Sequence, residues 1–212
     1  MNRLALALLP NAALAAASAS AMNLGANGGL EAGNSGCTRG YSYVPQPPTN
    51  ACCGGLWPEA TCGVGGNAHD FHALFTGGPQ SGAEFEIVNG AGTSGVKVWE
   101  ETGIAVAANT TCFCGAWVSS VNPGSPAQLA FSSNGALLGA TISPGSTTGG
   151  WTLFLQPWNS GAATSADIAL VNQNTTLTGN DFGVGSVSLS LAPPVVPAAA
   201  APPDQGATDR LT

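Results

Sequence analysis

Few side chains in this 212-residue sequence could do chemistry, and the two histidines are the first to consider. His69 and His72 lie in the run His-Asp-Phe-His, at a predicted loop or strand start. With Cys62 they offer the nitrogen and sulfur ligands that zinc prefers, provided that the fold brings the three together tetrahedrally. The alternative is that the histidines only stabilise a loop by hydrogen bonds.

The sequence does not single out a catalytic residue. A hydrolase of the serine type needs a nucleophile beside a base, and the sequence contains no G-x-S-x-G turn. A glycosidase needs two facing carboxylates, and nothing selects a pair among Glu59, Glu84, Glu86, Glu100 and Glu101. A secreted glycoside hydrolase is therefore the least supported alternative.

Aromatic side chains are the better candidates for binding. Sugar sites combine an aromatic platform with a few polar groups. Trp57, Tyr41 and Tyr43 lie in predicted loops or short edges, so we expect them to be exposed and close together. Trp117 and Trp151 have the parity of core-facing strand residues, and we expect both to be buried.

The N-terminus has the features of a secretory signal peptide. Arg3 precedes the apolar run 4–9, and Ala19-Ser20-Ala21 fits the small-x-small cleavage rule, so residues 1–21 are predicted to be removed. Pro10-Asn11 interrupts the apolar run, which disfavours a membrane anchor. We expect a secreted or cell-surface protein with no membrane span after cleavage.

An exported chain with an even number of cysteines predicts disulfides. The four cysteines of the irregular segment and the two on one strand would then be joined by two long-range links and one link within the loop. The alternative is a set of free thiols, or zinc bound by Cys62 and His72. The six candidates are Cys37, Cys52, Cys53, Cys62, Cys112 and Cys114.

Composition narrows the class of partner. The chain has four Lys and Arg residues and a formal net charge of −7, which argues against nucleic acid and anionic membranes. Its apolar content is ample for a core. Residues 192–212 are rich in alanine and proline, and this composition is typical of an extended, disordered tail.

Between these ends the sequence reads as one all-β domain. Alternating or apolar runs of strand length follow one another from residue 83 to 191, and Asn134-Gly135 is a strong signal for a tight hairpin. The run 83–88 alternates, so Phe85 and Ile87 are expected inward and Glu84 and Glu86 outward. This spacing predicts an antiparallel β-sandwich.

The last predicted strand, 182–191, has a break in its parity. Phe182 and Val184 share one face, but Val187, Leu189 and Leu191 have the opposite parity. One core receives both sets only if a residue is inserted, so we predict a β-bulge at Gly185-Ser186. We also expect the two ends of the domain to meet around this strand.

Four stretches resemble the galactose-binding-like jelly-roll domains of secreted bacterial surface proteins. They are NGGLEAGN (27–34), AWVSSVNPGSPAQLAFSSNGALLG (116–139), the strand 151–159 and GNDFGVGSVSL (179–189). The resemblance covers residues 23–191 and implies a jelly-roll sandwich, with carbohydrate as the favoured ligand. It also favours a structural histidine near His69 and His72 over a metal ligand.

The same resemblance implies a structural calcium ion, held by a glutamate of the first strand and acidic residues of the closing strand. Glu31 matches the first position, but Gly185-Ser186 stands where the family has two acidic residues. Calcium takes six to eight oxygens. With only Glu31, Asp181 and the neutral Asn180 left, we expect an empty or weak Ca²⁺ site.

The sequence thus predicts a secreted or cell-surface, non-catalytic binding module whose partner is a polysaccharide or glycan. A purely structural or adhesive protein of the envelope or matrix is the alternative.

Overall fold

The computed structural model describes residues 23–46, 55–56 and 58–194. The predicted signal peptide and nearly all of the predicted tail lie outside these residues, as do Cys52, Cys53 and Trp57. None of the helices within the described ranges is long and apolar enough to cross a membrane.

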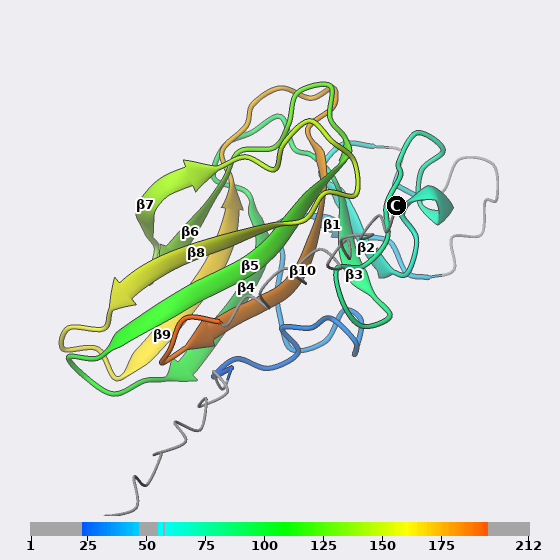
Figure 1. Ribbon diagram of the computed structural model, residues 1–212. Coiled ribbons are helices and arrows are strands. Elements are labelled where there is room, and N and C mark those ends of the chain that lie inside the picture. The colour runs from blue at the N-terminus through cyan, green and yellow to red at the C-terminus, as the bar shows by residue number, and fades with distance from the viewer. Residues whose placement is uncertain (1–22, 47–54, 57, 195–212) are drawn as a thin grey trace, which may run out of the picture.

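The chain forms an antiparallel β-sandwich of the jelly-roll type, as predicted (Figure 1). All strand pairs are antiparallel except β1 with β2, which are parallel. The first sheet has the order β1 (Ser42–Tyr43), β2 (Thr61–Gly65), β3 (Phe85–Asn89), β10 (Asp181–Ser190), β5 (Thr111–Asn122), β8 (Thr152–Asn159). The second has the order β4 (Lys97–Ala105), β9 (Ser165–Asn172), β6 (Leu129–Ser133), β7 (Ala136–Ile142).

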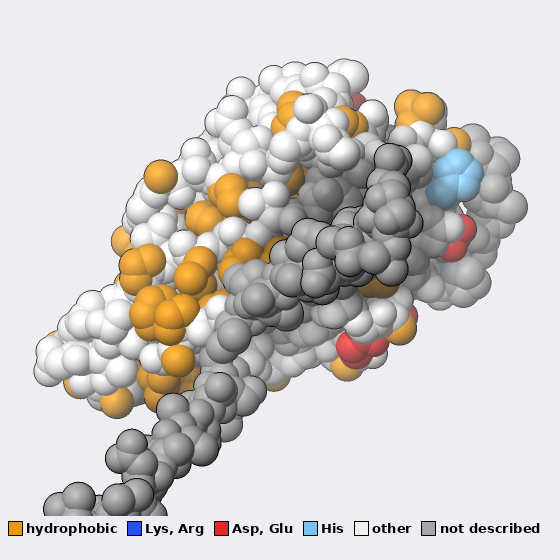
Figure 2. Space-filling view, viewed as in Figure 1, with side chains coloured by type: hydrophobic (Ala, Val, Ile, Leu, Met, Phe, Trp, Pro, Cys, Tyr) orange, Lys and Arg blue, Asp and Glu red, His pale blue; other side chains and the backbone are white. Residues whose placement is uncertain are grey.

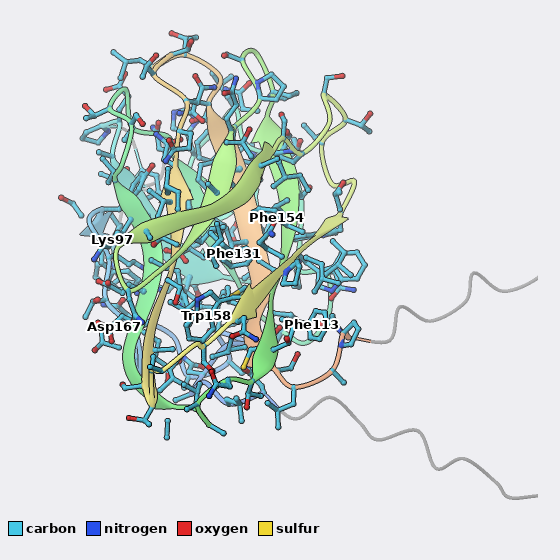
Figure 3. All side chains as sticks on the ribbon, turned by 90° about the vertical axis from the view of Figure 1, so that its left-hand side faces the viewer. Lys97, Phe113, Phe131, Phe154, Trp158 and Asp167 are labelled. Carbon is cyan, nitrogen blue, oxygen red and sulfur yellow. The ribbon has the colours of Figure 1, made fainter. Side chains whose placement is uncertain are left out.

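The main core lies between the two sheets. Phe131 of β6 stacks on Phe154 of β8 with ring centroids 4.7 Å apart, and Figure 3 shows both rings between the layers. Trp99, which the sequence left unassigned, is 2% exposed in the same core. The predicted hairpin is confirmed: Asn134 and Gly135 have φ of 49° and 82° and join β6 to β7.

A second apolar cluster covers part of the outer face of the six-stranded sheet. Phe85 and Ile87 of β3 point to this cluster, where residues 66–80 with the short 3-10 helix η1 (Ala68–Asp70) supply Phe71 and Phe75. Glu86 has the opposite parity and is completely buried inside the sandwich. The predicted outward orientation of Glu86 was therefore wrong, because β3 is buried on both faces.

The predicted β-bulge is confirmed. The pairing of β10 with β5 shifts between Gly185 and Ser188, and Ser186 has a φ of 49°. The inserted residue allows Val184 and Val187 to reach the same core. The ends of the domain also meet here, since Leu24 donates from its backbone N–H to the Leu189 carbonyl at 2.7 Å.

Candidate functional site

The outer face of β5 and β8 is apolar, and the second cluster covers it only at the Val121 end of β5. Trp117 of β5 pairs with Leu153 of β8, and Gly115 pairs with Leu155. Trp117, Leu153 and Leu155 are each half-buried. Figure 2 shows hydrophobic side chains gathered on this side of the molecule, and Figure 3 places Phe113 beyond the sheet, away from the core.

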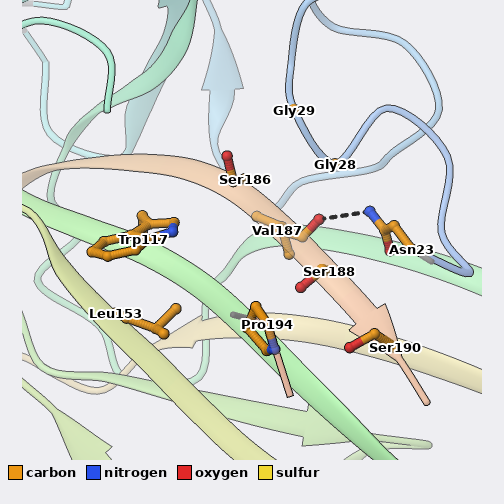
Figure 4. Close-up of a pocket in the computed structure, with 10 residues that line it drawn as sticks. All are labelled: Asn23, Gly28, Gly29, Trp117, Leu153, Ser186, Val187, Ser188, Ser190 and Pro194. Carbon is orange, nitrogen blue, oxygen red and sulfur yellow. Dashed lines mark hydrogen bonds between the residues drawn. The ribbon is translucent and has the colours of Figure 1, made fainter. Parts of the chain in front are cut away.

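A hollow of about 260 Å³ lies at the Trp117 end of this apolar face (Figure 4). Trp117 and Leu153 supply its apolar surface, and hydroxyl groups follow along β10. No charged side chain is among the residues that line it, which are Asn23, Gly28, Gly29, Trp117, Leu153, Ser186, Val187, Ser188, Ser190 and Pro194. We call this hollow the Trp117 pocket.

The neighbours of Trp117 leave its indole accessible. Gly185 of β10 is its cross-strand partner on one side, and Leu153 of β8 is its partner on the other. Glycine has no side chain, and the ring of Trp151 lies over Gly185, 3.7 Å from where a Cβ atom would be, so Trp117 is left partly exposed. The bulge that follows directs Ser186 and Ser188 toward the pocket, where both are half-buried.

The segment 23–29 forms one wall of the pocket and is bound tightly to β10. The Asn23 side chain donates to the Val187 carbonyl at 3.1 Å and accepts from the Leu189 N–H at 3.0 Å. Val187 N–H donates to the Gly28 carbonyl at 2.7 Å. A Cβ atom on Gly28 would lie 1.8 Å from the Val187 carbonyl oxygen, so only glycine fits at this position.

A second anchor holds the segment 23–29 from the other sheet. Both carboxylate oxygens of Glu101, on β4, accept from the backbone N–H of Ala26, at 2.8 and 2.9 Å. This glutamate, one of the carboxylates considered for glycosidase chemistry, therefore positions the pocket wall.

The chemistry of the pocket fits an uncharged, polyhydroxylated ligand. An indole face binds the C–H faces of a ring by apolar contact, and hydroxyl and amide side chains provide directional hydrogen bonds. A charged ligand would have no counter-charge among the lining residues.

The aromatic residues predicted to form a platform lie elsewhere. Tyr41 is 5% exposed, and its hydroxyl accepts from the Ala91 N–H at 3.2 Å; burial raises its pKa. Tyr43 is half-buried beneath the Arg39 guanidinium, 5.8 Å from the ring centroid. The exposure expected for Tyr41 was wrong, because its hydroxyl satisfies a buried backbone donor. Trp57 lies outside the described residues.

The sequence did not identify Trp117 as a candidate binding residue, because both faces of β5 are apolar. Trp117 and Trp151 were both predicted to be buried in the core, but both are half-buried. Trp151 packs edge-on against Phe85 of the second cluster, at 5.7 Å, and donates to the Gly78 carbonyl. The small set Cys112, Cys114, Ala116 and Val118 faces the core instead. When a strand has small residues on its core face and a large tryptophan on its outer face, the alternation of apolar residues does not show which face is buried.

The structure does not bring the predicted calcium ligands together. Glu31 accepts from the N–H groups of Ala83 and Glu84, at 2.9 and 3.2 Å, just before β3. Asp181 pairs with Asn89 at the far end of β3, so the two carboxylates are separated by roughly 13 Å of strand. Asn180 lies beside Asp181 and donates to the Ala91 carbonyl. A single calcium ion needs oxygens at about 2.3–2.6 Å.

The histidines and Cys62 lie on different sides of the sheet. The His72 ring packs against Phe75 in a tilted arrangement, with centroids 4.4 Å apart, and accepts at Nδ1 from the Leu74 N–H, while Cys62 belongs to the main core. His69 is exposed on η1. Within the described ranges no group of three His, Cys, Asp or Glu side chains could hold a metal ion.

The structure shows no disulfide between Cys37, Cys62, Cys112 and Cys114, all of which are free thiols. The predicted disulfide framework is thus not formed among these four residues. Burial raises the pKa of each thiol, to about 12 for Cys114. Such thiols are poor nucleophiles, because little thiolate forms at neutral pH.

Among the comparisons with known proteins, the one with solved structures finds proteins of similar fold. No family model matches the chain, and no curated protein matches it in sequence. The CBM22-1–CBM22-2 tandem domain of Paenibacillus barcinonensis Xyn10C aligns with a TM-score of 0.52 at 16% identity, covering 92% of this chain and 51% of that one.

Two further solved structures are similar. An apo-form cyclase from Fischerella sp. aligns with a TM-score of 0.55 at 15% identity, covering 84% of this chain and 100% of that one. A Family 16 Carbohydrate Binding Module aligns with a TM-score of 0.47 at 16% identity, covering 79% of this chain and 99% of that one. At these identities the likeness concerns the jelly-roll fold alone, which the chain shares with carbohydrate-binding modules and cyclases.

Proposed function

We propose that this protein is a non-catalytic carbohydrate-binding module whose ligand is bound in the Trp117 pocket. The observation that carries the proposal is the partly exposed Trp117 beside the serine hydroxyls of β10, in a pocket whose lining has no charge. A sugar ring presents an apolar face and a rim of hydroxyls, and this pocket matches both.

The apolar strip extends along the sheet from the pocket. Trp117 and Phe113 are four residues apart on β5, roughly 13 Å, and Leu155 of β8 lies between them in register. Pro194 lies beside Leu155 over Gly115 and adds to the apolar surface, so a ligand longer than one sugar ring would pass over Pro194 and Leu155 to reach Phe113. This favours a polysaccharide or oligosaccharide over a monosaccharide.

The fold supports the proposal only in general terms. Jelly-roll sandwiches named as carbohydrate-binding modules are among the structural neighbours, and so is a cyclase. The pocket favours binding over catalysis, since none of its lining residues is a histidine, cysteine or carboxylate that could serve as acid, base or nucleophile.

A glycan array followed by calorimetry tests the proposal. A central tryptophan in a binding pocket contributes about 2 kcal/mol or more, so Trp117→Ala should weaken binding by roughly 30-fold or more. Trp117→Phe should retain part of the affinity. Leu137→Ala, an exposed apolar residue of β7 on the other sheet, is the matched control and should change nothing. Glycan binding that survives Trp117→Ala unchanged would exclude this pocket.

We further propose that the protein acts outside the cell, after removal of residues 1–21. Edman or mass-spectrometric sequencing of exported protein should find Met22 at the N-terminus. A chain that retains residues 1–21 would contradict the proposal.

If no glycan binds, a structural or adhesive role in the envelope becomes the better account.

A further inference from the structure

A second hollow, of about 490 Å³, lies at the opposite end of β10 from the Trp117 pocket. Asp181 lines it, and Ser186, the nearest β10 residue of the Trp117 pocket, is five residues away, or roughly 17 Å. We call it the Asp181 hollow. Its lining comes from five segments far apart in the sequence: Pro58 and Glu59; His72, Leu74 and Phe75; Asn89; Asn122; and Leu177, Thr178, Gly179 and Asp181.

The Asp181 carboxylate is held in a fixed position on the wall of this hollow. It is 4% exposed, accepts at Oδ1 from the Gly90 N–H at 3.2 Å and accepts at Oδ2 from the Asn122 side-chain amide at 2.9 Å. Each carboxylate oxygen can accept more than one hydrogen bond. Acceptor capacity therefore remains on a carboxylate whose geometry is already set.

The hollow has an apolar rim as well as a carboxylate. Four large hydrophobic side chains are exposed within the described ranges, and two of them, Leu74 at 67% and Leu177 at 50%, line this hollow. Phe75 and His72, whose rings pack against each other, line the same hollow. Two exposed leucines at the mouth of one polar hollow are a surface that an apolar group could cover.

The charged side chains that line the hollow are all acidic. Asp181 and Glu59 are the acidic residues, and no lysine or arginine is among the lining residues. Burial lowers the pKa of His72, so this imidazole is neutral at pH 7. The hollow thus combines a positioned carboxylate, a second carboxylate and an apolar rim.

We propose that the Asp181 hollow is a second binding site, for a small organic cation whose protonated amine contacts Asp181 and whose apolar body covers Leu74 and Leu177. An ammonium group donates strong, short hydrogen bonds to a carboxylate, and its charge is matched by Asp181 and Glu59. The site does not depend on carbohydrate binding, because it shares no residue with the Trp117 pocket.

The protonation of Asp181 sets the pH dependence of cation binding. Burial raises its pKa to about 6, against the hydrogen bonds from Gly90 and Asn122, and the charge of Glu59 raises it further. Tyr41, whose pKa is raised, and His72, whose pKa is lowered, are the other titratable groups nearby. A bound cation favours the charged carboxylate, so binding should weaken as the pH falls below 6.

NMR and calorimetric titrations with n-butylammonium test the proposal, with n-butanol as the neutral probe of equal length. We expect saturable binding of the cation at pH 7.5, at least tenfold weaker binding at pH 5, and shifts confined to the Asp181 hollow. Affinity should rise about two- to fourfold for each added CH₂ as the chain covers the leucines.

Substitutions separate the contribution of the Asp181 carboxylate to binding from that of the exposed leucines. Asp181→Asn should weaken butylammonium binding at least tenfold. Leu177→Ala replaces an exposed residue, leaves the fold unaffected and should weaken binding several-fold. Asp167→Asn, at an exposed carboxylate of β9, is the control and should have no effect. Equal binding of n-butanol, unchanged binding by Asp181→Asn and Leu177→Ala, or no saturable binding would each overturn the proposal. Glycan binding, measured on the same variants, should be unaffected.

Discussion

Arg39 donates from Nε to Glu86 Oε1 at 2.5 Å inside the sandwich, where the Arg39 side chain is 3% exposed and the Glu86 side chain is completely buried. The pair joins the long segment before β1 to the middle of β3. Cys62 of β2 and the ring of Tyr43 adjoin it. One oxygen of Glu86 and one terminal nitrogen of Arg39 have no hydrogen-bond partner, whereas the other terminal nitrogen of Arg39 donates to the side chain of the exposed Asn34.

Removing one partner of this pair should strongly destabilise the fold. Glu86→Gln leaves the guanidinium buried without a counter-charge, and such changes cost about 3–5 kcal/mol. Urea unfolding should show a lower midpoint with an unchanged slope. Glu100→Gln is the control, because Glu100 pairs with Lys97 near the surface, where an ion pair contributes less than about 1 kcal/mol. Equal losses for the two variants would contradict the assignment.

Asp181 should make stability depend on pH. Its pKa is about 6 in the folded protein, against an ordinary value of 3.8, so the folded state binds more protons between these values. Its contribution is therefore most favourable below pH 4 and is lost as the pH rises through 6, by on the order of 2–3 kcal/mol. The difference in free energy of unfolding between Asp181→Asn and the wild type should change accordingly between pH 4 and pH 7. A constant difference would show that Asp181 has an ordinary pKa.

Gly28 should be irreplaceable, and its neighbour Gly29 should not. A Cβ atom at position 28 would lie 1.8 Å from the Val187 carbonyl oxygen, whereas at position 29 the nearest contact is 3.9 Å. Gly28→Ala should push the segment 23–29 from β10, lowering stability by about 2 kcal/mol and weakening ligand binding at the Trp117 pocket. Gly29→Ala is the matched control for stability, since Gly29 itself lines the pocket. Similar melting temperatures for the two variants would count against this packing.

The bulge should be sensitive to the residue at position 186. Ser186 has a φ of 49°, a left-handed conformation that is unfavourable for β-branched side chains. Ser186→Val should therefore destabilise the protein by about 1–2 kcal/mol, while Ser186→Gly should be neutral or slightly stabilising. Thermal unfolding of both variants measures this. If valine were tolerated as well as glycine, β10 would have to adopt another register.

The sequence by itself determined the class of fold and several local features. The alternation of apolar residues predicted an antiparallel sandwich, Asn134-Gly135 predicted the β6–β7 hairpin, and the parity break predicted the bulge at Gly185-Ser186. These features depend on the alternation of apolar residues and on turn residues, and both act within short stretches of the chain.

Only the tertiary structure decided which face of each strand is covered, and by what. Glu86 is buried because Arg39, 47 residues away in the sequence, meets it inside the sandwich. Residues 66–80 cover the outer face at β3, which buries Phe85 and Ile87 there, and at the Val121 end of β5, but they do not bury Trp117. Trp117 is therefore accessible, although the local pattern of β5 fits the core equally well. Burial depends on contacts between distant segments, and the period of one strand carries no information about them.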